Sequence, residues 1–114
     1  MQIEIQTRSF ALTEALRSHA ERRLHCALSC CDNHIQRVVV RLYDINGPRG
    51  GADKCCHLHV VLAHLPDLVV EDTQIDLYAA IDRAAERAAR RLVRQIARKR
   101  TLLRQVRHPV ATAP

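Results

Sequence analysis

The segment that most constrains this chain is a periodic run from Leu77 to about Arg100 or a little beyond. At 100° per residue, with Arg83 at zero, its arginines fall between about −20° and +80° and its apolar residues between about 140° and 220°. The two opposed stripes predict one long amphipathic helix, with Asp76 as its N-cap, that buries the apolar stripe and exposes the arginines over about 20 Å. The arginine stripe consists of Arg83, Arg87, Arg90, Arg91, Arg94 and Arg98, and the apolar stripe of Tyr78, Ile81, Ala85, Ala88, Leu92 and Ile96.

Positive charge is concentrated in the same segment. Residues 83–107 hold ten basic residues and one acid, Glu86, whereas residues 1–82 carry a net charge of −3. Arginines four residues apart on a helix repel one another by about 0.2–0.5 kcal/mol per pair. The alternative interpretation of the stripe is a helix face that is merely solvated, but such a face normally carries both acidic and basic residues. The arginine stripe therefore favours an anionic partner, and guanidinium groups suit bidentate contacts with phosphate.

The rest of the chain predicts one helix and four strands. Alternating and periodic apolar residues indicate strands at residues 2–8, 35–43, 54–62 and 68–73, and an amphipathic helix from an N-cap at Thr13 to about Cys30. The loop at 44–53 holds all three glycines and reads as a hairpin connection. The order β-α-β-β-β-α predicts an α+β fold: a four-stranded, mostly antiparallel sheet with both helices packed on one face, as in a double-stranded-RNA-binding domain.

The length of 114 residues corresponds to about one domain. We predict a single domain at residues 1–107 and a disordered tail at 108–114, which has little to bury. The N-terminus alternates polar and apolar residues, and no apolar run approaches the length needed to cross a bilayer. These features predict a cytoplasmic protein with reduced thiols and no membrane partner.

Cysteines and histidines gather at residues 25–31 and 55–59. Neither group has paired C-x2-C ligands, and adjacent cysteines such as Cys30 and Cys31 do not easily chelate one ion. Cys56 fits a small core position, and His57 and His59 fit the polar face of a strand. We therefore predict neither a metal nor a cofactor, while a thiol- or metal-dependent regulatory or protein-interaction module stays open as an alternative.

Catalytic motifs are missing from the sequence. None of the three serines lies in a G-x-S-x-G context, and the glycine cluster lacks the G-K-[ST] ending of a phosphate-binding loop. With three aromatic residues, the chain also lacks the stacking platforms of single-strand readers. The sequence thus predicts a binder rather than an enzyme, without a small-molecule substrate, that contacts RNA through phosphates and shape. A standalone double-stranded RNA binder is a further alternative.

Two motifs resemble a known family. The run D-L-Y-A-A-I-D at Asp76–Asp82 resembles the D-M-Y-A-A-I-D that opens the second helix of the ribosome hibernation promoting factors and ribosome-associated inhibitors. The run T-E-A-L-R at Thr13–Arg17 resembles the start of their first helix. The resemblance spans about residues 1–100 and keeps the order of elements. At 114 residues we expect a short member, without the additional ribosome-dimerising domain of the long ones.

The resemblance implies a partner and a site. Family members sit on the small ribosomal subunit, in the channel where messenger and transfer RNAs lie, and block translation under stress or in stationary phase. Five arginines stand where the family usually has Lys or Arg, and charge geometry alone adds Arg83 and Arg91. The expected RNA-binding set is therefore Arg23, Arg83, Arg87, Arg90, Arg91, Arg94 and Arg98, in a protein expected to be a monomer when free.

Overall fold

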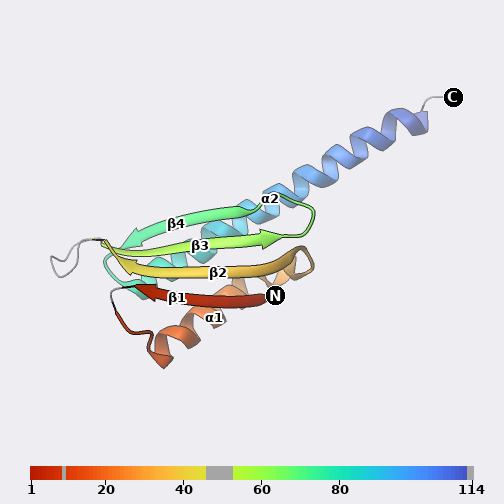
Figure 1. The fold of residues 1–114 in the computed structure, drawn as a ribbon. Coiled ribbons are helices and arrows are strands. Elements are labelled where there is room, and N and C mark those ends of the chain that lie inside the picture. Colours follow the sequence, from red (N-terminus) through yellow and green to blue (C-terminus); the bar gives the residue numbers. More distant parts are fainter. Residues whose placement is uncertain (9, 46–52, 113–114) are drawn as a thin grey trace.

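Four strands form one sheet in the order β1-β2-β3-β4, with both helices behind it (Figure 1). The computed structural model describes residues 1–8, 10–45 and 53–112, with 103–112 described as backbone. The elements are β1 (Gln2–Arg8), α1 (Glu14–Leu28), the 3-10 helix η1 (Ser29–His34), β2 (Ile35–Asp44), β3 (Lys54–Leu62), β4 (Leu68–Gln74) and α2 (Leu77–Thr112). The predicted α+β class and element order are confirmed.

The sheet is mixed. β1 and β2 are parallel, as expected for strands joined through a helical crossover, and the β2–β3 and β3–β4 pairs are antiparallel. The register pairs Asp44 with Lys54, so the connection between β2 and β3 joins antiparallel neighbours as predicted. The glycine cluster itself, at 47–51, lies outside the described residues.

The core lies between the sheet and the helices. Alternate strand residues point towards the helices and are buried, whereas β1 contributes its half-buried residues Ile3 and Ile5. The buried helix residues repeat every three or four positions, as the sequence predicts. They are Leu16, Ala20, Leu24 and Leu28 on α1, and Ala80, Ile81, Ala84, Ala85, Ala88, Leu92 and Ile96 on α2.

Tyr78 departs from its predicted place in the buried stripe. Its side chain is 37% exposed, and its ring lies edge-on to His19 with the ring centroids 4.9 Å apart. The ring therefore covers the end of the seam between the helices, while the smaller Ala80 and Ala84 occupy the core beside it. In a close-packed seam, small residues let two helix backbones approach, and a phenol fits better at the rim.

Both helices end differently from the prediction. α1 begins at its predicted N-cap, where the Thr13 hydroxyl accepts a hydrogen bond from the amide of Leu16 at 3.2 Å. It changes to a 3-10 turn after Leu28, because Cys31 leaves helical geometry (φ −117°, ψ 17°) and is buried. α2 continues to Thr112; residues 77–108 contain neither glycine nor proline, and Pro109 lies in the last turn of the helix.

This longer α2 includes residues 108–112 of the segment for which we predict a disordered tail. Its C-terminal part projects past the end of the sheet (Figure 1). The division into a domain at 1–107 and a tail at 108–114 stays a prediction. No helix in the described ranges has both the length and the apolar character required to span a membrane.

Candidate nucleic-acid interface

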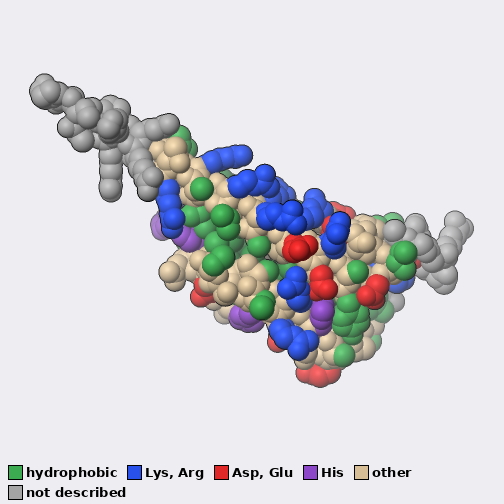
Figure 2. All heavy atoms as spheres, turned by 180° about the vertical axis from the view of Figure 1, so that it is seen from behind, with side chains coloured by type: hydrophobic (Ala, Val, Ile, Leu, Met, Phe, Trp, Pro, Cys, Tyr) green, Lys and Arg blue, Asp and Glu red, His purple; other side chains and the backbone are tan. Residues whose placement is uncertain are grey.

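The arginine stripe of α2 lies on the outside of the molecule. All six arginines of the stripe are exposed, whereas Ile81, Ala88 and Leu92 on the opposite side of the helix are fully buried. Seen from the helix side, basic side chains form a line along α2 (Figure 2). Burial of the apolar stripe therefore leaves a one-sided basic surface, and its side chains fall into two rows with different surroundings.

The first row faces the edge strand β4, and we call it the edge row. It consists of Arg87, Arg91, Gln95 and Lys99, each four residues after the last. These side chains donate, in that order, to the backbone carbonyl oxygens of Glu71, Val69, Pro66 and His64, at 2.8, 2.7, 3.0 and 2.9 Å. The edge row thus ties α2 to β4 and to the turn that precedes it.

Matching periods explain the part of the edge row that faces β4. Four helix residues rise about 6 Å, and two strand residues span about 6.6 Å, so Arg87 and Arg91 meet the carbonyls of Glu71 and Val69. β4 is an edge strand, and its outward carbonyls have no neighbouring strand to pair with. Arg87 and Arg91 donate to two of them, which also covers part of an edge that would otherwise be open to another strand.

Arg87 has a second partner at the start of this row. Its Nη1 lies 3.1 Å from Oδ2 of Asp72, a carboxylate on the helix face of β4 that is only 9% exposed. The other Asp72 oxygen accepts a hydrogen bond from Gln74 at 2.7 Å. A nearly buried carboxylate requires such partners, so Arg87 is committed to the fold more strongly than the other five arginines of the stripe.

The second row points away from the sheet, and we call it the outer row. It consists of Arg83, Arg90, Arg94 and Arg98. Arg90 has one acid nearby, Glu86, at 3.9 Å, which is beyond hydrogen-bond distance. Within the described ranges, Arg83, Arg94 and Arg98 have no ion pair and no hydrogen-bond partner. Apart from the Arg90–Glu86 pair, the outer row is therefore the part of the predicted site whose charge has no partner among the described residues.

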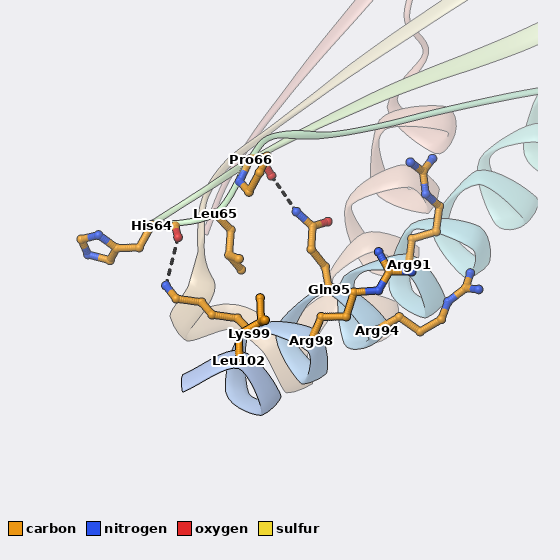
Figure 3. A pocket seen from close by; sticks show the side chains of 9 residues that line it. All are labelled: His64, Leu65, Pro66, Arg91, Arg94, Gln95, Arg98, Lys99 and Leu102. Atoms are coloured by element: carbon orange, nitrogen blue, oxygen red, sulfur yellow. Dashed lines mark hydrogen bonds between the residues drawn. The ribbon is translucent and has the colours of Figure 1, made fainter. Parts of the chain in front are cut away.

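A hollow of about 620 Å³ lies where α2 passes the turn between β3 and β4 (Figure 3). Lys99 and Gln95 reach across it to the turn, while the Arg94 guanidinium points away (Figure 3). The turn supplies apolar side chains, Leu65 and Pro66. This arrangement places guanidinium groups beside a partly apolar floor, which suits a sugar-phosphate backbone lying along the helix.

The turn itself is held in a strained conformation. His64 has a positive φ of 62°, in the left-handed region that costs a residue with a Cβ about 1–2 kcal/mol. Lys99 donates to the carbonyl of this same residue. The edge row therefore fixes the turn at one end of the hollow, and the geometry of the hollow depends on it.

Arg23 lies apart from both rows. It is half-buried on α1, and its Nε donates to Oδ1 of Asp82 on α2 at 2.9 Å. His19 contacts the same oxygen through Nε2 at 2.8 Å. Asp82 thus joins the two helices. The sequence alone did not predict this role, because the contact is between residues about sixty positions apart in the chain. The RNA-binding role of Arg23 stays a prediction.

The first acid of the D-L-Y-A-A-I-D run also has a structural role. Asp76 caps α2 as predicted: its Oδ2 accepts from the amide of Ala79 at 3.3 Å, and its carbonyl accepts from the amide of Ala80 at 3.0 Å. Ala80 and Ile81 are buried. The motif therefore starts the helix, packs it and, through Asp82, attaches it to α1, which fixes the direction in which the outer row points.

The thiols do not assemble into a site. All five cysteines are free; Cys31, Cys55 and Cys56 are buried, while Cys26 and Cys30 are exposed. Burial raises the pKa of Cys56 to about 12, and burial together with the Cys30 thiol raises that of Cys31 to about 11, so both are protonated near neutral pH. In the portion of the chain that is described, no three His, Cys, Asp or Glu side chains are grouped so as to hold a metal.

The comparisons with known proteins agree with this architecture. Among solved structures, a ribosomal subunit interface protein from Coxiella burnetii matches with a TM-score of 0.74 and 22% identity, over 85% of this chain and 99% of that one. The N-terminal domain of Thermus thermophilus Protein Y matches with a TM-score of 0.68 and 28% identity, over 82% of this chain and 98% of that one. No curated protein matches the sequence.

The family is established by the sequence itself. Residues 3–100 match the family described as Sigma 54 modulation protein / S30EA ribosomal protein, a span that includes both rows and the capping motif. This match confirms the resemblance to the hibernation factors and covers most of the chain. The protein therefore belongs to the Sigma 54 modulation protein / S30EA ribosomal protein family, whose members are ribosome-associated proteins and not enzymes.

Proposed function

We propose that this protein binds the small ribosomal subunit in the cytoplasm, through phosphates of ribosomal RNA in the channel for messenger and transfer RNA, and so inhibits translation under stress or in stationary phase. The observation that carries the proposal is the outer row. Its guanidinium groups lie on one side of α2 and are exposed, and among the described residues the row has one ion pair for four arginines, Arg90 with Glu86 at 3.9 Å. A phosphate backbone supplies the missing negative charge.

The mechanism is occlusion. The free protein is a monomer whose helix α2 is held on the sheet by packing and by the edge row, so the outer row is presented before binding begins. Preorganised donors lose little conformational entropy when they bind. A folded domain seated in the channel excludes messenger and transfer RNA by volume alone, so the protein needs no catalytic group.

Sedimentation with ribosomes tests the proposal. The protein should travel with small subunits in a gradient at low salt and remain at the top at high salt, because counterion release makes phosphate contacts salt-dependent. Four phosphate contacts predict a slope of about −3 to −3.6 in a plot of log affinity against log salt. Association that does not respond to salt would contradict the proposal.

A pair of matched variants separates the outer row from net charge. One variant replaces Arg90, Arg94 and Arg98 by Ala, and the control replaces Arg17, Arg22 and Arg37, three exposed arginines outside α2. Both lower the net charge by three. We expect the first to lose co-sedimentation and the control to keep it; equal loss in both would show that overall charge, and not the outer row, determines binding.

Competition distinguishes the ribosome from duplex RNA in general. A short RNA duplex at a large molar excess should displace little of the protein from small subunits if the channel geometry contributes to binding. Displacement at stoichiometric duplex would instead favour the standalone double-stranded RNA binder. Translation of a reporter messenger in a cell-free system then provides the functional readout, with inhibition expected from the wild type and from the control variant.

A further inference from the structure

The open face of the sheet, on the side away from the helices, carries a second group of basic side chains. This face is turned towards the viewer in Figure 1. Arg8, Arg41, Tyr43 and His57, on three adjacent strands, line a pocket of about 450 Å³ together with Gln6. The volume falls within the usual range for small-ligand sites. The outer row of α2 belongs to the helix layer, so this pocket is a separate place on the molecule.

The two arginines are diagonal neighbours in the sheet. The register pairs Arg8 with Tyr43, and Gln6 with Arg41, which places the two guanidinium groups on one face one step apart. Both side chains are exposed. Arg8 lies over the Tyr43 ring, 5.7 Å from its centroid. In the described part of the chain neither arginine has a carboxylate within 4 Å, so their mutual repulsion is uncompensated.

Two acids of this face, Glu71 and Glu4, bind residues that line the pocket and not its arginines. One oxygen of Glu71, on β4, accepts hydrogen bonds from the Tyr43 hydroxyl at 3.0 Å and from the Cys55 thiol at 3.3 Å. Glu4, on β1, accepts from the amide of Gln6 at 3.4 Å. Glu71 holds the Tyr43 phenol in place as one wall of the pocket and is the cross-strand neighbour of His57, while among the described residues no carboxylate lies within 4 Å of Arg8 or Arg41.

His57 contributes an unusual polar atom to the same pocket. Its Nδ1 is buried and has no hydrogen-bond partner in the described ranges. Burying an unpaired polar group costs about 1–3 kcal/mol. Arg41 is its cross-strand neighbour on β2. Rotation of the ring towards a bound anion would give this nitrogen a partner, and the anion would gain a third donor beside the two guanidinium groups.

We propose that the pocket between Arg8, Arg41 and His57 is a phosphate-binding site, independent of the outer row of α2. Two guanidinium groups and an imidazole suit a group with several acceptor oxygens, and phosphate provides three or more. The phosphate comes either from an RNA backbone or from a free nucleotide or inorganic phosphate. A site on each face would let the protein hold an anion at the sheet while α2 contacts a phosphate backbone.

A nuclear magnetic resonance titration tests the site on the full chain. The ¹⁵N-labelled protein that carries Ala at positions 90, 94 and 98 is titrated separately with inorganic phosphate, uridine monophosphate and a uridine hexamer, so that the outer row does not contribute. We expect saturable shifts at His57, Arg41 and Arg8 with at least one probe. The absence of saturable shifts with all three probes would overturn the proposal.

Two further variants make the assignment specific. Arg41→Ala should weaken binding of the effective probe at least tenfold, whereas Arg37→Ala, an exposed arginine on the same strand and face but outside the pocket, should leave it unchanged. Equal weakening by both would overturn the site. Unchanged amide spectra away from the pocket establish that each variant is folded.

The probes also identify the source of the phosphate. Tighter binding of the hexamer than of inorganic phosphate supports an RNA backbone, and equal binding supports free phosphate; tightest binding of uridine monophosphate supports a nucleotide. Each result supports the proposed site. Because the titration is made in the outer-row variant, its outcome does not depend on whether that variant still binds ribosomes.

Discussion

The two rows of α2 contain similar side chains in different surroundings. In the edge row, Arg87 and Arg91 donate to carbonyls of β4 at 2.8 and 2.7 Å, and Arg87 also pairs with the nearly buried Asp72. In the outer row, Arg94 and Arg98 have no partner among the described residues. The position of the edge strand, and not the type of residue, decides which arginines maintain the fold and which remain available to a ligand.

Mutations in the two rows should therefore affect different properties of the protein. Loss of an edge-row side chain should lower the free energy of unfolding, because a backbone carbonyl or a buried carboxylate loses its donor. Loss of an outer-row side chain should lower affinity for RNA and leave stability unchanged. An arginine that changes both quantities equally would contradict this division.

The largest effect is expected from the complete outer row. Replacing all four of its arginines by Ala removes four phosphate contacts. The slope of log affinity against log salt should therefore become less negative by about three, and the affinity for small subunits at low salt should fall about a hundredfold or more. Exposed substitutions usually change stability by less than about 0.5 kcal/mol, so the melting temperature should stay nearly constant. Filter binding and thermal unfolding measure the two quantities. A variant that melts much earlier would show that the outer row also supports the fold.

The second effect is on stability, at Arg87. Its replacement by Ala leaves the Asp72 carboxylate with Gln74 as its remaining hydrogen-bond partner and removes the donor to Glu71 O. Because the arginine side chain is half-exposed, solvent moderates the loss to about 1–2 kcal/mol in the free energy of unfolding, measured by urea denaturation.

Arg83, one turn earlier in the outer row, is the matched control for Arg87. Arg83→Ala removes the same charge from the same helix and should change the free energy of unfolding by less than about 0.5 kcal/mol. In a double-mutant cycle, Arg87→Ala and Asp72→Ala should show coupling, whereas Arg83→Ala and Asp72→Ala should be additive. Coupling of equal size in both cycles would contradict the assignment of Arg87 to the edge row.

Sequence periodicity predicts much of this structure because it reports local geometry. The strands agree with their predicted ranges to within about a residue, Thr13 and Asp76 cap the helices, and the burial of Ile81, Ala88 and Leu92 follows the helical period. The helical wheel also places all six arginines of the stripe outside. These features depend on residues a few positions apart, for which a single sequence is informative.

The division into rows does not follow from the wheel. Arg87 and Arg98 lie about 20° apart on it, yet Arg87 meets a carbonyl of β4 and Arg98 meets none, because the difference depends on where the edge strand runs along the helix. The same holds for Asp82, whose partners on α1 are about sixty residues away. Tertiary register determines these contacts, and the pocket on the open face arises from cross-strand neighbours in the same way.

A third experiment gives effects of opposite sign. Asp82→Ala releases Arg23 and His19, so stability should fall by about 1 kcal/mol, the usual contribution of such bonds. The same change frees Arg23 and removes an acid next to Arg83, so the affinity for small subunits should rise a few-fold. Glu86→Ala is the control: it removes an exposed acid that makes no contact with α1, and should raise affinity without loss of stability. A rise with Asp82→Ala no larger than the rise with Glu86→Ala would indicate that Arg23 acts only as a helix tie.

The smallest effect is the most direct test of the two rows, since Gln95 is the uncharged member of the edge row. Gln95→Ala removes its donor to the carbonyl of Pro66, a neutral and partly exposed hydrogen bond that contributes about 0.5 kcal/mol, which corresponds to a few degrees at most in melting temperature. Amide hydrogen exchange should accelerate along the turn and β4. Because no charge changes, affinity for small subunits and its salt dependence should equal those of the wild type. If affinity falls in this folded variant, the edge row contacts the ribosome as well, since removal of an uncharged side chain leaves the field of the outer row unaltered.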